Sequence, residues 1–339
     1  MISEMKKHSD AVSLLNRKLK DTKLDVQCTS TRSMVISESI QRTIQSIKNV
    51  KEFISSIPYT LDFLSFLFNV ERKDFTMNFG QHSGENNIDI TYYKPMGDGP
   101  FDVILFDSGL RTGVRELPLI AIWLARMGYV VVGVYSEREV FKDEGKDFVT
   151  ALSFMRYLPF VSKRAIPIGI SSGGAVALRL AADQTAVQLG VVGSIAIDTY
   201  YDIRRMHYYA HNYVATHEPD DHRTKVLQRY IDYEKGVTPE KDPEVFANAD
   251  IIPIIPQIQV PVLLVHGVSD QIVPVEESID LFTALKQHKK EAYLKLVVGE
   301  GVHAPPIDFV FDFIDTIGLI ETIAAVKGFL KTLKSKKAD

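Results

Sequence analysis

The sequence predicts an α/β fold, with a mostly parallel central sheet flanked by helices, a helical N-terminal extension and a helical lid insertion. After residue 85, short apolar runs alternate with helix-compatible segments, a pattern typical of a sheet covered on both faces. Before residue 71 the chain is poor in glycine, and apolar residues recur at helical spacing. Residues 200–253 interrupt the later alternation with one long polar segment.

Composition narrows the class of protein. The chain has 339 residues, of which 45% are hydrophobic and 24% are charged, the balance of an ordinary globular protein. Its 39 basic and 43 acidic residues nearly cancel, so no bulk field would draw the protein onto nucleic acid. We therefore expect no nucleic-acid partner.

Several features indicate a cytoplasmic protein without a membrane span. Cys28 is the single cysteine, which rules out an intramolecular disulfide and suits a reducing compartment. Residues 1–21 contain no continuous apolar run of signal-peptide length. The apolar stretch 61–70 is interrupted by polar residues and has about half the length that a transmembrane helix needs.

The extension, residues 1–70, contains a helical stripe of apolar residues that ends before Pro58. Its members recur at steps of three or four: Ile36, Ile40, Ile44, Ile47, Val50, Ile54 and Ile57. We favour packing of this stripe on the main domain. A homodimer formed through the N-terminal helices, or a wall of a substrate channel, are the alternatives.

Residues 71–339 form the predicted catalytic domain. Residues 87–93 alternate like a half-exposed edge strand. The apolar runs that suit buried strands are 102–106, 130–135, 165–170, 193–197, 262–266 and 294–298. Helices are expected at 115–127, before Gly128, and at 173–183. Residues 200–253 are much longer than a usual connection, so we interpret them as a lid inserted over the site.

The strongest chemical signal is the pentapeptide 169–173, Gly-Ile-Ser-Ser-Gly, between a strand candidate and a helix candidate. A serine on a tight strand-to-helix turn is exposed above the sheet, and small neighbours let the backbone pass closely. Ser171 is therefore the candidate nucleophile. The backbone N–H of Ser172, at the helix N-terminus, is one candidate donor to an oxyanion.

A serine needs a base within hydrogen-bond reach, and His303 is the best candidate. It lies in a loop just after the last strand candidate, where its side chain could reach the carboxyl edge of the sheet. The supporting acid is expected at Asp270, after the strand 262–266, because the order Ser, Asp, His then results. Asp198, which ends another strand candidate, is the competitor; it could instead cap the first lid helix or point into the pocket.

The second oxyanion donor should follow the strand 102–106, where we choose the backbone N–H of Leu110 because Gly109 permits a sharp turn. Together, the three motifs resemble the α/β-hydrolase superfamily, especially its dienelactone-hydrolase and acyl-peptidase-like esterase branches. The resemblance covers about residues 85–339. Those relatives usually have His-Gly at the first oxyanion turn, whereas this chain has Ser108-Gly109.

The resemblance implies acyl transfer without a cofactor, and Ser171 argues against the superfamily enzymes that use an aspartate nucleophile. We rank a carboxylesterase acting on a small-molecule ester first. A peptidase, a thioesterase or a carbon–carbon bond hydrolase would use the same triad. A non-catalytic binding protein on the same scaffold is the alternative from another class.

The lid segment adds two smaller candidates. His207 and His211 are one helical turn apart and could ligate a metal, but no third ligand follows at a recognisable spacing, so we expect no metal site. Arg204 or Arg205 could attract a carboxylate on the substrate. A solvated or ion-paired arginine is the commoner arrangement, and the substrate-binding residues stay unknown.

Overall fold

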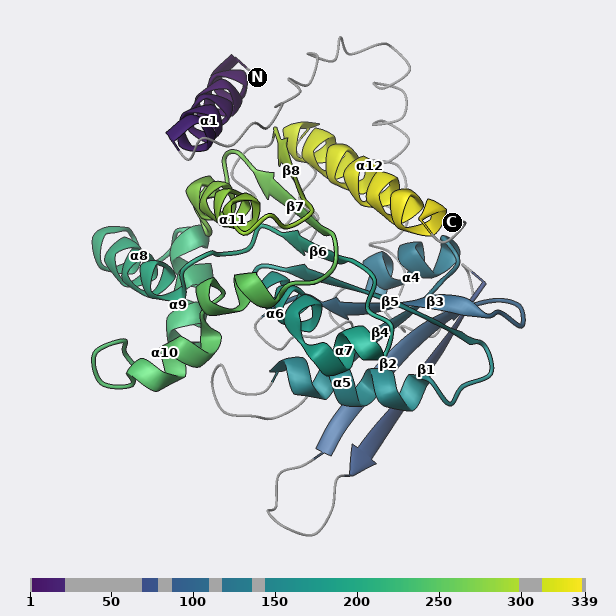
Figure 1. The fold of residues 1–339 in the computed structure, drawn as a ribbon. Helices are drawn as coiled ribbons and strands as arrows, with labels where there is room; N and C mark the ends of the chain where they lie inside the picture. The colour runs from purple at the N-terminus through teal and green to yellow at the C-terminus, as the bar shows by residue number, and fades with distance from the viewer. Residues whose placement is uncertain are drawn as a thin grey trace.

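A computed structural model of the protein describes residues 2–21, 69–78, 87–109, 118–135, 144–298 and 313–336. The predicted α/β fold is confirmed: a single eight-stranded sheet has the strand order β1-β2-β4-β3-β5-β6-β7-β8 (Figure 1). Strands β3 to β8 run parallel to one another, while β2 is antiparallel to both β1 and β4. In order, the strands are Val70–Asn78, Asn87–Pro95, Phe101–Asp107, Tyr129–Tyr135, Val161–Ile170, Ser194–Ile197, Val262–Gly267 and Ala292–Val297.

Helices cover both faces of the sheet because successive strand residues point to opposite sides. On β3, Ile104 and Phe106 pack with α4 (Pro118–Arg126) and α12 (Phe313–Ser335). Val103 and Leu105, between them, pack on the other face. That face is covered by α5 (Glu144–Met155), α6 (Ser172–Ala182), α7 (Gln184–Gln188) and α11 (Val275–Gln287). Figure 1 shows α4 and α12 on the side of the sheet opposite α5 and α7.

Residues 200–257, between β6 and β7, form the helical excursion. It consists of α8 (Ile203–Thr216), α9 (His222–Glu234), α10 (Pro243–Ala249) and a 3-10 helix, η1 (Ile252–Gln257). Asp202 caps α8, because its side chain accepts the N–H groups of the second and third helical residues. Asp221 caps α9 in the same way. Polar caps at two helix starts explain why so polar a segment is regularly helical.

The N-terminal helix α1 (Ile2–Asp21) packs against α11 through a narrow apolar face. Ala11 and Leu15 are buried there, and Lys18 forms an ion pair with Asp280 of α11. A helical start of the extension is thus observed, docked on the main domain. The apolar stripe 36–57 lies outside the described residues.

The seven predicted strands are all present, but the outer part of the sheet differs from the prediction. The strand that begins at Asn87 is not an edge strand: β1 lies outside it, and Ile88, Ile90 and Tyr93 of β2 are buried. The sequence pattern missed β1 because four of its nine residues are charged. Its polar side chains pair across the strands, as in the hydrogen bond of 2.5 Å between Thr91 and Asp74.

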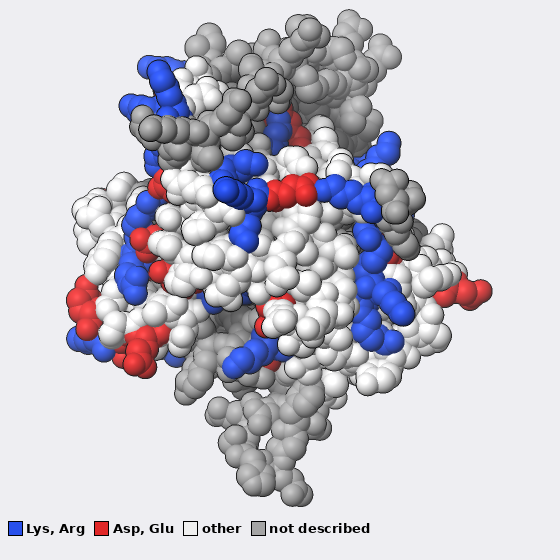
Figure 2. All heavy atoms as spheres, viewed as in Figure 1, with Lys and Arg blue, Asp and Glu red and all other residues white. Residues whose placement is uncertain are grey.

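Charged side chains of both signs are scattered over the surface. On the face in Figure 2, basic and acidic groups alternate between broad uncharged areas. Among the helices in the described ranges, none combines the length and the apolar character that crossing a membrane requires.

Candidate active site

Ser171 occupies the tight turn between β5 and α6 that the sequence predicted for it. Its backbone has φ 57° and ψ −125°, a conformation that is unfavourable for a residue with a side chain. Hydrogen bonds on both sides hold it there. The Ser171 N–H donates to the Ile197 carbonyl (2.8 Å), and its own carbonyl accepts from the Gly174 N–H (3.0 Å) and the Thr199 hydroxyl (2.9 Å). The turn is therefore built into the sheet rather than left as a loose loop.

The turn closes because two positions have no room for a side chain. A Cβ at Gly169 would lie 1.9 Å from the carbonyl oxygen of Gly173. A Cβ at Gly173 would lie 2.4 Å from the carbonyl oxygen of Asp107, at the end of the neighbouring strand β3. Backbone atoms cannot move away from such contacts cheaply, so both glycines are required for this geometry.

The ends of β3 and β5 meet where the strand order reverses, since the connection from β3 leads to β4 and the one from β5 leads to β6 on opposite sides. Ligands bind at such switch points in open α/β sheets. Gly109, with φ +88°, follows β3, and its N–H donates to the Asp107 side chain (2.8 Å). A Cβ added at Gly109 would lie 3.0 Å from Oγ of Ser172, so Gly109 lies close to the start of α6.

The predicted oxyanion donors are thus placed only in part. Ser172 is the first residue of α6, so its backbone N–H lies at the helix N-terminus. Leu110, the second predicted donor, lies outside the described residues, as does the predicted base His303.

Asp270 lies in the loop after β7 and is 8% exposed. Its Oδ1 accepts the N–H groups of Ile272 (2.8 Å) and Val273 (3.0 Å), which fixes the orientation of the carboxylate. Its Oδ2 is 3.6 Å from Nε2 of His266, which is fully buried on β7. The carboxylate is held by the loop's own backbone.

Two further side chains fix the loop of Asp270. His266 is within hydrogen-bond distance of the Ser278 hydroxyl (2.6 Å) and the Val273 carbonyl (2.9 Å). The Tyr209 hydroxyl of α8 donates to the Gln271 carbonyl (2.6 Å). Burial, followed by the nearby charge of Asp270, raises the pKa of Tyr209 to about 12, so this hydroxyl keeps its proton at neutral pH. The helical excursion therefore contacts the loop that carries the predicted acid.

Asp198, the competing acid, ends β6 with φ +48° and is 1% exposed. Its Oδ1 accepts the Gly267 N–H at 2.9 Å, which ties β6 to the end of β7. It does not cap α8, because Asp202 does. Asp198, His266 and Asp270 nevertheless gather their polar atoms within 4.8 Å of one another, so both candidate acids lie in one buried cluster.

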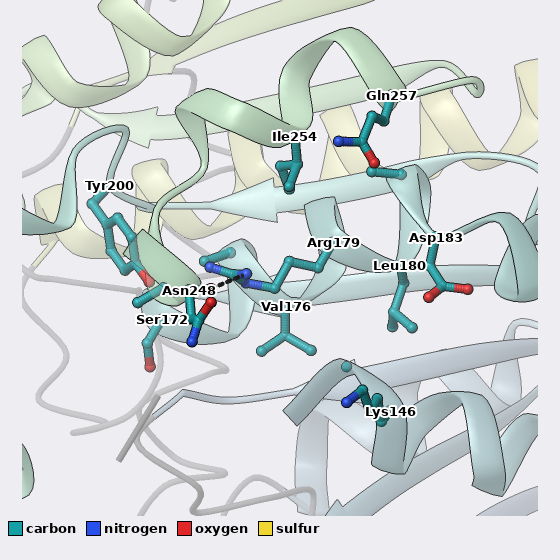
Figure 3. A pocket seen from close by; sticks show the side chains of 14 residues that line it. Lys146, Ser172, Val176, Arg179, Leu180, Asp183, Tyr200, Asn248, Ile254 and Gln257 are labelled. Atoms are coloured by element: carbon teal, nitrogen blue, oxygen red, sulfur yellow. Dashed lines mark hydrogen bonds between the residues drawn. The ribbon is translucent and has the colours of Figure 1, made fainter. Parts of the chain in front are cut away.

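A cavity of about 500 Å³ adjoins the serine turn along α6. Ser172, Tyr200 and Asn248 lie at one end, and Arg179 extends across the middle, as Figure 3 shows. Ala175, Val176 and Leu180 add an apolar wall from α6, and α10 and η1 supply the opposite side. The volume is within the usual range for small-molecule pockets.

The lid candidates have specific partners. Arg205 donates to Glu277 (2.7 Å) and to Asp280 (2.8 Å), and Arg204 is 3.4 Å from Asp250. Both arginines are thus ion-paired within the chain. His207 and His211 both contact Glu234 of α9, a third ligand-type side chain that sequence spacing did not reveal because it lies 23 residues beyond His211.

The family model for the prolyl oligopeptidase family matches residues 137–304, a range that contains the predicted Ser, Asp and His. A curated relative, "Uncharacterized peptidase YtmA" of Bacillus subtilis, is 26% identical over 210 residues, which are 58% of this chain and 74% of that protein.

Solved structures share the fold at lower identity. The Pyrococcus furiosus esterase Pf2001 has a TM-score of 0.55 and 18% identity, and the match covers 81% of this chain and 94% of the esterase. The Pyrococcus horikoshii acylaminoacyl peptidase has a TM-score of 0.53 and 16% identity, with 73% of this chain covered. The chain spans only 40% of that peptidase. Its sheet order and its serine turn give this chain the α/β-hydrolase fold, and over residues 137–304 it is similar to the prolyl oligopeptidase family of serine hydrolases.

Proposed function

We propose that this protein hydrolyses carboxylic esters of small molecules through an acyl-enzyme on Ser171. The observation that carries the proposal is the strained turn of Ser171 at the reversal of strand order, between β5 and α6. A strained residue held by several hydrogen bonds is typical of functional sites. The chemistry typical of a serine on such a strand-to-helix turn is attack on a carbonyl carbon.

The proposed reaction has two steps. His303 takes the proton of the Ser171 hydroxyl as Oγ attacks the carbonyl, and Asp270 orients and supports the imidazolium. The N–H groups of Ser172 and Leu110 stabilise the oxyanion, and His303 then protonates the leaving alcohol. In the second step His303 activates water, which releases the acid. No cofactor takes part in this scheme.

Ester cleavage is our first choice because an alkoxide leaves more readily than an amine. The site therefore has to stabilise the leaving group less in an ester than in an amide. A peptidase is the second candidate, and the curated relative of Bacillus subtilis, whose name calls it a peptidase, favours it. The two reactions share the same residues and differ in the pocket.

The test of the proposal is turnover of p-nitrophenyl esters from acetate to palmitate by wild type and Ser171→Ala. Loss of the hydroxyl should reduce kcat by about 10⁴-fold or more while thermal stability is kept. Ser172→Ala should lose far less, because only its backbone N–H is assigned a role. Matched p-nitroanilides separate ester from amide preference. Undiminished turnover by Ser171→Ala would refute the assignment.

Asn substitutions distinguish the two buried acids. Asp270→Asn should lower kcat by about 10²–10⁴-fold, since a neutral amide cannot support the imidazolium. Asp198→Asn should stay within about tenfold of wild type, because an amide oxygen can still accept the Gly267 N–H at the position of Oδ1. Both variants are compared on one ester, with melting temperatures as the folding control. The reverse ranking would assign the acid to Asp198.

The cavity along α6 is our proposed site for the acyl group. Asn248 is exposed and lines one end of it, and its backbone carbonyl, which accepts from Arg179, survives substitution. Asn248→Trp should therefore lower kcat/KM for long acyl chains by about tenfold or more and leave acetate turnover nearly unchanged. Equal effects on short and long esters would place the acyl chain elsewhere. Asn248→Ala is the matched control.

A further inference from the structure

The helical excursion contains a cluster of three ligand-type side chains from two helices. His207 and His211 lie one turn apart on α8, and Glu234 is the last residue of α9. Nδ1 of His207 is 2.9 and 3.0 Å from the two carboxylate oxygens of Glu234. Nε2 of His211 is 3.1 Å from one of them. One ligand atom of each residue lies within 4.8 Å of the ligand atoms of the other two.

The burial of Glu234 calls for a compensating positive charge. Its side chain is 1% exposed, and a buried carboxylate is costly unless it is paired. Among the described residues, the basic groups within ion-pair distance of Glu234 are the two imidazoles, which carry a charge only when protonated.

The spacing of the three groups suits a small divalent cation. A tetrahedral zinc with bonds of about 2.0–2.1 Å holds its ligand atoms about 3.3 Å apart. The two imidazole–carboxylate separations of 2.9 and 3.1 Å need to open by only a few tenths of an ångström, and the ligand nitrogens of His207 and His211 lie within 4.8 Å of each other. His207 is already fixed in orientation, because its ring packs edge-on against Phe246 at 5.3 Å and is 5% exposed. A fixed ligand is a feature of built metal sites.

We propose that His207, His211 and Glu234 bind Zn²⁺. Two imidazole nitrogens and one carboxylate are ligands that zinc accepts. The side chain of His211 is 45% exposed, which gives the ion a path from solvent and leaves the fourth position to water. The residue after His207 is Tyr208, where zinc proteases with two histidines at this spacing have a glutamate base. The proposed ion would join α8 to α9.

A zinc ion that joins α8 to α9 would also help to fix the loop that carries Asp270. α8 also carries Tyr209, which donates to Gln271 beside Asp270. A bound ion would stabilise the folded excursion in proportion to its occupancy, because the unfolded chain does not hold the three ligands together.

The test is calorimetric titration of the metal-free full chain with ZnCl₂ at about pH 7.5. We expect one zinc per chain, micromolar or tighter, and a rise in melting temperature on binding. His211→Ala removes an exposed ligand without opening the core and should weaken binding by about tenfold or more. His222→Ala, an exposed histidine at the start of α9, is the matched control and should bind as the wild type does.

Co²⁺ provides a second readout that does not depend on stability. Four-coordinate cobalt bound in place of zinc should give visible absorption bands in wild type and His222→Ala and none in His211→Ala. Glu234→Gln, which keeps the shape of the buried side chain, should also lose them. No zinc uptake by the wild type, or equal uptake by His211→Ala, would overturn the proposal.

Discussion

The contact between the turn after β5 and the end of β3 is the constraint on which the candidate site depends. Gly169 and Gly173 let two backbone segments pass at distances that exclude any side chain. This closeness makes α6 begin directly above the sheet, with Ser171 in a strained conformation and Ser172 at the helix start. The strain is sustained by hydrogen bonds to β6 and to Thr199, so the serine is positioned by the core of the fold and not by its own loop.

The loop that carries Asp270 is a second well-fixed part of the candidate site, and it follows β7, two strands away from β5 in the sheet. The loop after β7 holds Asp270 through its own backbone, and His266 and Tyr209 secure that loop from β7 and from α8. Asp198 ties β6 to β7 beside it. Because the helical excursion contributes Tyr209, its folding and the geometry of the acid are linked. The proposed zinc site would tighten the same helix, which connects the proposed ion to the candidate chemistry.

Local motifs were predictable from sequence, whereas contacts between distant segments were not. The turn of Ser171 could be predicted because its glycines, its strand and its helix are adjacent in the chain. The strand β1 was not predicted because it pairs with β2 through polar side chains, such as Asp74 with Thr91. These pairs can be identified only once the register of the two strands is known. The sequence did not identify Glu234 as a third ligand for a similar reason, because Glu234 contacts His207 only after α9 has packed on α8. The assignments of Leu110 and His303 stay predictions.

The central claim is that Ser171 is an activated nucleophile, and covalent labelling tests it most directly. The full chain is treated with a fluorophosphonate, which reacts with activated serines, and the modified peptide is identified by mass spectrometry. The account predicts a single adduct on Ser171 that forms in the native protein and does not form when the protein is unfolded by heat before labelling, since activation needs the folded site. No adduct, or an adduct on another serine with Ser171 unmodified, would contradict it.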